Sequence, residues 1–154
     1  TSLAGGGTIS GVWTLATGAR LQATYADLAE RFEADEIYDA GTVVEIGGEK
    51  EITAVSSDAS EEVFGVISTT AAFTMNGVAG DDNTHPAIAV SGRVPVKVIG
   101  KVKKGQRLVS STIKGYARGA DKDEITAFNV IGRALEHKIT NGAGTVLSVV
   151  SITK

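Results

Sequence analysis

Short apolar runs separated by glycine-containing turns fill most of this 154-residue chain, and they restrict its fold more than any other feature. Each run spans four to eight residues, which is typical of a strand and short for a helix. Pairs such as Gly47-Gly48 and Asn141-Gly142 mark the turns. The pattern predicts a mainly β protein, with strands at 42–46, 51–55, 63–68, 87–90, 94–99, 107–110, 115–118, 129–135 and 145–152.

Two parts of this strand-rich region resemble each other. Gly41–Glu45 is followed by Val63–Ile67, and Lys104–Val109 is followed in a similar way by Val130–Leu135. Closing a sheet on itself hides the strand edges that would otherwise pair with other chains. We therefore expect two related halves that form one compact, β-barrel-like head domain over residues 41–154.

Composition supports this fold class and excludes several kinds of site. The chain is long enough for one hydrophobic core, and its 19 glycines and 5% aromatic residues fit many short strands around a core of small aliphatic side chains. It has no cysteine, so it has no disulfide, thiolate zinc site or cysteine nucleophile. Neither a membrane-spanning run nor a signal peptide is present, and the start at Thr1 indicates a piece of a longer polypeptide.

Residues 8–23 alternate between apolar and polar side chains and predict a β-hairpin that turns near 16–18. One two-stranded hairpin cannot bury its own apolar face. The segment therefore needs a partner, most simply copies of itself, and we expect residues 1–23 to form a trimerising β-stem. The expected contact residues are Ile9, Trp13, Leu15 and Leu21.

Residues 24–33 are the one stretch that predicts a helix. Thr24 is a suitable N-cap, Asp27 stands three positions later, and Leu28 and Phe32 are four residues apart on one face. So short a helix needs packing against the rest of the protein. We expect residues 24–40 to be a linking helix followed by an acidic loop.

Charge is segregated along the sequence although the net charge is only −3. Residues 27–62 hold twelve acidic and two basic side chains, whereas residues 93–118 hold eight basic and no acidic ones. Tyr116 is the only aromatic residue of the basic stretch, so the interleaved rings of a nucleic-acid platform are missing. We expect no nucleic-acid partner, and acidic and basic faces that complement each other within or between subunits.

Few residues can carry chemistry. Asp81, Asp82 and His85 share the polar loop 75–86 but lack metal-ligand spacing, and no glycine-rich segment is placed to cradle a phosphate, so we expect neither metal nor cofactor. On a helix, Asp27 and Glu30 would project from one face, where paired carboxylates can act as acid and base. Capping by Asp27 and solvation of Glu30 are the simpler interpretation of the same spacing.

Several segments, in this order, resemble the C-terminal domain of bacteriophage tail-fibre and appendage proteins. The tail-fibre-like virion proteins of T4-like marine phages are most similar. The resemblance extends from Gly11 to the end of the chain. The segments that carry it are Tyr25–Glu33, Gly41–Val44, Gly48–Glu51, Val63–Ser68, Ala72–Asn76, Thr84–Pro86, Gly92–Gly100 and Lys103–Gly105.

The resemblance implies a homotrimer at the end of a fibre. The group is similar to the intramolecular-chaperone domains of phage appendages, some of them glutamic peptidases that release themselves by self-cleavage. It implies cleavage near Ala26–Asp27 by Asp27 and Glu30 in members that cut themselves. It also implies a virion location on a tail or appendage fibre, extracellular once assembled, with the upstream fibre shaft as a neighbour.

These observations favour a non-enzymatic trimerisation and tip module that sets chain register and contacts the host surface. One alternative is the autoproteolytic chaperone that uses Asp27 and Glu30. Another is a glycan- or receptor-binding tip that uses loop residues Asn76, Asp81, Asp82 and His85. The scarcity of aromatic residues counts against sugar binding, because sugars commonly stack on rings.

Overall fold

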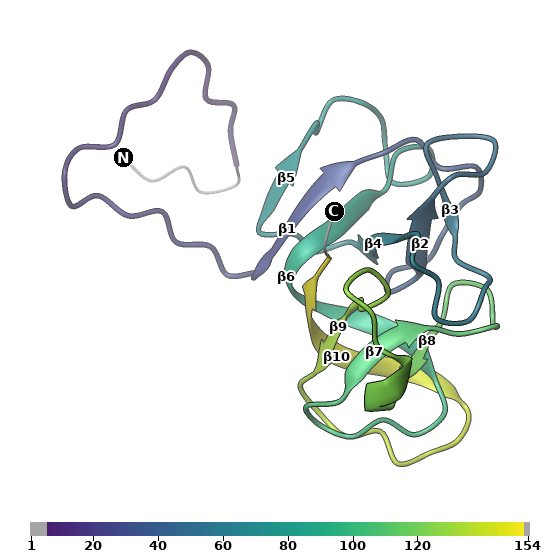
Figure 1. The fold of residues 1–154 in the computed structure, drawn as a ribbon. Helices are drawn as coiled ribbons and strands as arrows, with labels where there is room; N and C mark the ends of the chain where they lie inside the picture. The colour runs from purple at the N-terminus through teal and green to yellow at the C-terminus, as the bar shows by residue number, and fades with distance from the viewer. Residues whose placement is uncertain (1–5, 153–154) are drawn as a thin grey trace.

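The computed structural model describes residues 6–152 and is built almost entirely of β-strands (Figure 1). Among these residues there is no α-helix, and one 3-10 helix, η1, spans Lys122–Glu124. The mainly β fold class predicted from the sequence is confirmed. The strands are β1 (Asp27–Arg31), β2 (Val43–Ile46), β3 (Ile52–Ala54), β4 (Val63–Ser68), β5 (Phe73–Met75), β6 (Ala87–Ile99), β7 (Arg107–Ser110), β8 (Ala117–Gly119), β9 (Gly132–Ala134) and β10 (Ala143–Ser151).

The predicted helix at 24–33 is wrong, because this segment forms strand β1. It pairs antiparallel with β6 and parallel with β5. Asp27 and Ala29 are buried while Leu28 between them is exposed, which is the two-residue period of a strand. A ten-residue helix is marginal in isolation. Two partner strands satisfy the backbone here and outweigh the local helix propensity.

β6 is the central element of the fold. The two strands predicted at 87–90 and 94–99 are one strand of 13 residues, although Gly92 lies at the expected break. Gly92 has φ +107, and a Cβ there would come within 2.1 Å of the carbonyl oxygen of Ala26. Glycine therefore lets β1 approach β6 without interrupting it.

A closed five-stranded barrel, called barrel two, occupies the lower half of Figure 1. Its strands follow one another in the order β6, β8, β7, β9 and β10, and β10 pairs again with β6 over nine residues. The second half predicted from the sequence therefore closes a barrel of its own. The expected single barrel made from both halves does not describe the arrangement.

The other half of the chain repeats this arrangement around the other end of β6, and we call it barrel one. Its order is β6, β4, β2 and β3, and a parallel bridge between Ile52 and Ala34 joins β3 to the chain that leaves β1. The corresponding closure of barrel two is the parallel pair Val98–Ala117 between β6 and β8. The same connection closes both halves.

The strand registers of the two barrels agree residue by residue. Val44 pairs with Gly65 and with Ala54 in barrel one. Leu108 pairs in the same way with Gly132 and with Gly119 in barrel two. The similarity between the two halves in the sequence therefore corresponds to a duplicated unit.

Apolar packing joins the two barrels. The interior of barrel one holds Val44, Ile52, Ile67 and Ile88, with the Phe32 and Phe64 rings packed edge to face at 4.9 Å. A larger cluster contains residues of both barrels, so the two barrels share one apolar contact. Its members are Val43, Val55, Val63, Val66, Ala89, Val94, Val96, Val98, Val102, Leu108, Ala117, Ile131, Ala134, Val146 and Val150.

The N-terminal segment extends away from both barrels as an arm, residues 6–26 (Figure 1). The expected turn is present, because the amide of Ala19 donates to the carbonyl of Ala16. Over the described residues 6–23, the flanking strands of the predicted stem are not formed in the single chain. The division into units 1–23, 24–40 and 41–154 stays a prediction, and β1 places part of the middle unit within barrel one.

Candidate functional site

The predicted trimer residues all lie on the arm. Ile9, Trp13, Leu15 and Leu21 are between 50% and 85% exposed. Apart from the Ala16–Ala19 turn, the described residues 6–23 have no backbone hydrogen bond. The arm thus presents apolar side chains that the barrels of its own chain leave uncovered.

Asp27 and Glu30 lie on β1, where the strand changes their predicted relationship. Residues three apart on a strand point to opposite faces, so the shared helix face expected for this pair does not exist. Asp27 is 3% exposed and one carboxylate oxygen, Oδ2, has no hydrogen-bond partner. Glu30 is half-buried and stands opposite Ile88 of β6 and Met75 of β5.

The peptide bond between Ala26 and Asp27 is held between neighbouring strands. The carbonyl oxygen of Ala26 accepts a 3.2 Å hydrogen bond from the amide of Arg93, and that of Asp27 accepts one of 2.9 Å from Ala72. A hollow of about 300 Å³ opens beside this bond, lined in part by Tyr25, Asp27 and Arg93. A buried carboxylate with a free oxygen therefore lies next to a peptide carbonyl that a backbone N–H already polarises.

The polar loop 75–86 is fastened to Arg31 of β1. The Arg31 guanidinium forms a 2.8 Å ion pair with Asp82 and donates a 2.6 Å hydrogen bond to the carbonyl of His85. The Asn76 amide donates to the carbonyl of Arg31 at 3.2 Å. Three of the four predicted receptor-contact residues thus converge on one arginine, which holds the loop in place.

Asp81, the fourth of these residues, organises the loop internally. Its Oδ1 accepts hydrogen bonds from the amides of Asn83 and Thr84 and from the Thr84 hydroxyl. These bonds hold the pKa of the Asp81 carboxyl below its ordinary value. Within residues 6–152 no group of three histidine, cysteine, aspartate or glutamate side chains is placed to hold a metal ion.

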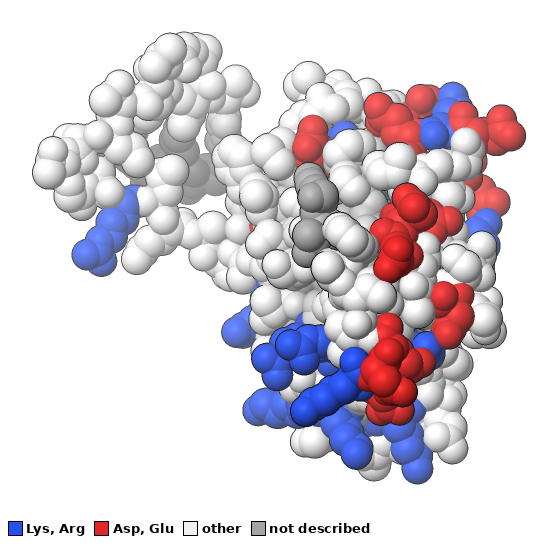
Figure 2. Space-filling model, in the orientation of Figure 1, with Lys and Arg blue, Asp and Glu red and all other residues white. Residues whose placement is uncertain are grey.

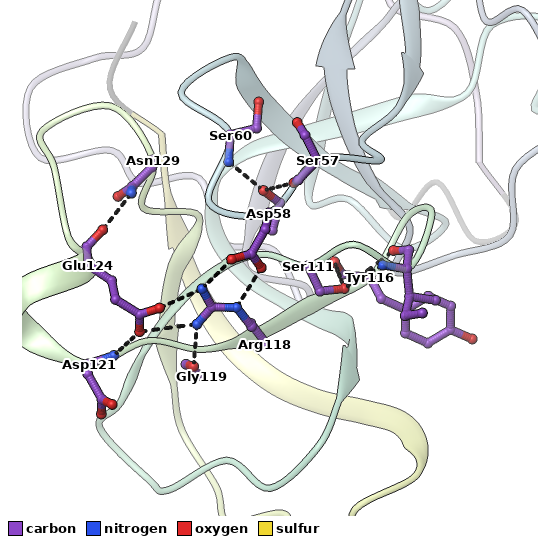
Figure 3. Close-up of polar contacts among 12 residues, drawn as sticks. Ser57, Asp58, Ser60, Ser111, Tyr116, Arg118, Gly119, Asp121, Glu124 and Asn129 are labelled. Carbon is purple, nitrogen blue, oxygen red and sulfur yellow. Dashed lines mark hydrogen bonds and ion pairs between the residues drawn. The ribbon is translucent and has the colours of Figure 1, made fainter.

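Arg118 is the centre of the most extensive ion-pair cluster, which the sequence did not single out (Figure 3). Its guanidinium makes two 2.7 Å bonds to Asp58 and bonds of 2.6 and 3.1 Å to Glu124. Hydrogen bonding to Arg118 is the main reason that the pKa values of both carboxyls are lowered. The cluster joins the loop before β4 in barrel one to β8 and η1 in barrel two.

The Arg118 cluster holds parts of the two barrels together. Both carboxylates are engaged by the arginine, and Glu124 also accepts the Asp121 amide at 2.8 Å. Beside it the Ser110 hydroxyl donates to the carbonyl of Ser57 and accepts from the amide of Ser60. The only signal in the sequence was the segregation of charge, since Arg118 belongs to the basic stretch and Asp58 to the acidic one.

Two further ion pairs join the same stretches. Lys114 lies 2.8 Å from Glu36, and Lys97 lies 3.3 Å from Asp39. The expected complementarity of acidic and basic faces within a subunit is therefore present. Among the described residues no helix is long and apolar enough to cross a bilayer.

Comparison with known proteins gives structural relatives only. No family model matches the chain, and no curated protein matches it significantly. The C-terminal fragment of gene product 12 of bacteriophage phi29 matches with a TM-score of 0.57 at 17% identity, over 81% of this chain and 100% of that one. The two share a fold.

Two other phi29 structures are similar. The pre-mature gene product 12 matches with a TM-score of 0.60 at 16% identity, and the match covers 87% of this chain and 23% of that one. The head fibre gp8.5 N base matches at 16% identity, over 82% of this chain and 97% of that one, with a TM-score of 0.46. This chain therefore corresponds to less than a quarter of the pre-mature gene product 12.

Proposed function

We propose that this chain is a structural module of a phage virion appendage or fibre, and that it sets the register of three parallel copies. The fold shared with the C-terminal fragment of gene product 12 of bacteriophage phi29 supports the virion role. The observation that carries the trimer is the exposed apolar arm. Its side chains gain burial when arms from several copies pair around a common axis.

The size of this gain makes the proposal testable. Trp13 is the only tryptophan of the chain and is 67% exposed in the single copy. Burying one large apolar side chain contributes about 1.5–3 kcal/mol, so three copies of Trp13 contribute about 4.5 kcal/mol or more per trimer. Trp13→Ser should then lower the association constant of the trimer by about a thousandfold or more.

Sedimentation equilibrium of the full chain is the decisive measurement. We expect about three times the chain mass of 15.8 kDa, and a blue-shifted Trp13 emission that moves to the red on dilution. Val78→Ser is the matched control, because Val78 is fully exposed on the loop 75–86 and should leave assembly unchanged. A monomer at concentrations of tens of micromolar would refute the trimer.

Self-cleavage at Ala26–Asp27 is a second candidate, favoured by the unpartnered buried oxygen of Asp27 beside the polarised Ala26 carbonyl. Incubation of the full chain followed by N-terminal sequencing should then give a fragment that begins at Asp27. Asp27→Ala should abolish the fragment, whereas Asp82→Ala on the loop should not. A chain that stays whole on prolonged incubation refutes this activity.

Host contact through Asn76, Asp81, Asp82 and His85 stays a prediction. The polar groups of this loop are occupied by bonds to Arg31 and within the loop itself. That arrangement presents a rigid surface and favours a positioning role for the loop next to β1.

A further inference from the structure

Because the barrel is duplicated, the same surface can be compared between barrel one and barrel two. In barrel one, Val43, Val66, Ala89 and Ala29 stand opposite one another on four adjacent strands, β2, β4, β6 and β1. All four are fully buried. Val43, Val66 and Ala89 of this row belong to the apolar cluster that the two barrels share.

The equivalent row of barrel two has a different composition. Arg107 of β7 pairs with Arg133 of β9, Arg133 pairs with Val149 of β10, and Val149 pairs with Arg93 of β6. All three arginines are exposed, and Val149 between them is 42% exposed. We call these four residues the arginine row. The position that carries an apolar docking surface in one barrel thus carries a basic, uncovered surface in the other.

Within residues 6–152, no acidic side chain neutralises the arginine row. Among residues 6–152, none of its three arginines has a carboxylate partner, in contrast to Arg118, Lys114 and Lys97. Arg133 donates only to the carbonyl of Gly105, at 3.1 Å. Like charges directly opposite on neighbouring strands are destabilising, as at Arg107–Arg133. An external anionic group would relieve this repulsion.

A surface of complementary character lies on the same chain. A hollow of about 330 Å³ near the end of β10 is lined by the apolar side chains Ile46, Phe64, Phe128 and Ile152, and its rim carries Glu61 and Glu62. Ile46 and Phe128 are each 53% exposed. Neither glutamate has an ion pair or a side-chain hydrogen bond within the part of the chain that the structure describes. We call this hollow the acid-rimmed groove.

The separation of charge is visible on one face of the molecule (Figure 2). Lysine and arginine gather at the lower left, in the region of β9 and β10, while acidic residues run down the right side and over the upper part. The two groups touch in the lower half of this face, and white residues separate them only further up. An interface with an apolar centre and a charged rim has the usual composition of a protein–protein contact.

We propose that the arginine row of one copy docks into the acid-rimmed groove of a neighbouring copy, with Val149 at the apolar centre and the arginines against Glu61 and Glu62. Two different patches then meet, which is a heterologous contact and builds a ring when the rotation closes. The inference rests on the proposed trimer and names the barrel surfaces that complete it. The arms associate around the trimer axis, and the contacts between barrels fix how the three copies are rotated relative to one another.

Charge reversal tests this contact in the full chain. Arg107→Glu with Arg133→Glu should raise the trimer dissociation constant at about 50 mM NaCl by about tenfold or more, and so should Glu61→Arg with Glu62→Arg. Combining all four substitutions should restore the wild-type value to within about threefold, because opposite charges again face each other. The neutral variant Arg107→Gln with Arg133→Gln should give a smaller change of the same sign and keeps the test valid if a reversal impairs folding.

Matched controls are available on both sides. Lys101→Glu changes an exposed cation outside the row, and Glu49→Arg changes an exposed acid on the β2–β3 turn outside the groove. Neither should alter the dissociation constant by more than about twofold. In addition, the wild-type constant should rise with salt more steeply than that of the neutral variant.

The outcomes separate this inference from the proposed function. A wild-type chain that sediments as a monomer refutes the trimer and this contact together. A wild-type trimer whose constant is unchanged by the reversals, or is not rescued by the fourfold swap, refutes the contact and leaves the trimer standing. Loss of polyphosphate binding in the arginine variants, with assembly unchanged, would assign the row to an anionic polymer and overturn the proposal.

Discussion

Gly132→Ala is the substitution whose effect follows most directly from the duplicated barrel. A Cβ at Gly132 would lie 2.2 Å from the carbonyl oxygen of Val149 and 2.9 Å from the Cα of Val150. Both are backbone atoms of the neighbouring strand, so no side-chain rotation can relieve the overlap. β9 and β10 must separate, although they are paired at Val150–Gly132 and closure of barrel two depends on that pairing.

The expected loss of stability has two contributions. Inserting a methyl group into a packed position typically costs about 1–3 kcal/mol. Weakening one adjacent backbone bond, from the Ser151 amide to the Ile131 carbonyl, adds about 1 kcal/mol. Gly132→Ala should therefore lower the free energy of unfolding by about 2–4 kcal/mol.

Urea unfolding at a fixed protein concentration measures this loss. With an m-value of about 2 kcal/mol/M, the midpoint should fall by about 1–2 M. Gly142→Ala is the control, because a Cβ there meets no atom within 4 Å and its φ is not positive. If Gly132→Ala unfolds within about 0.5 kcal/mol of Gly142→Ala, the close strand approach is refuted.

Two further predictions concern the Arg118 cluster and the arm. Because Arg118 lowers the pKa values of Asp58 and Glu124 in the folded chain, their contribution to stability is full above the ordinary values of 3.8 and 4.5 and is lost as the pH falls below them. Arg118→Met should flatten this acid limb in pH-dependent unfolding, whereas Lys101→Met, which removes an exposed cation outside the arginine row, should leave it unchanged. Deleting residues 1–23 should preserve the far-UV circular dichroism of the barrels while sedimentation shows a monomer, and a deleted chain that remains a trimer would contradict the role of the arm.

Local pattern was sufficient to predict much of the sheet. The expected strands at 63–68 and 107–110 match β4 and β7 at both ends, and 42–46 and 51–55 each contain the observed strand. Apolar alternation and glycine turns are properties of neighbouring residues, so they can be read without knowing the pairing. The similarity between the two halves also proved informative, because the similar segments pair in the same strand register in both barrels.

Pairing with distant strands determined the features that the local sequence pattern did not predict. Tyr25–Glu33 has good helix formers and a helical apolar stripe, yet β5 and β6 each pair with this segment as a strand. That pairing separates Asp27 from Glu30 onto opposite faces and buries Asp27 beside Arg93. Distant strands supply these contacts, so no window of sequence around residue 27 contains the information.

By itself, the sequence determined a β-rich chain of two related halves, an N-terminal segment with exposed apolar side chains, and a separation of acidic from basic residues. Tertiary structure alone decided that each half closes its own barrel around the shared β6, that Arg118 joins them through Asp58 and Glu124, and that Arg31 anchors the polar loop. It also placed Arg107, Arg133 and Arg93 in one exposed row. The physical reason is that alternation depends on adjacent residues, whereas closure, ion pairing and shared rows depend on strand register across the fold.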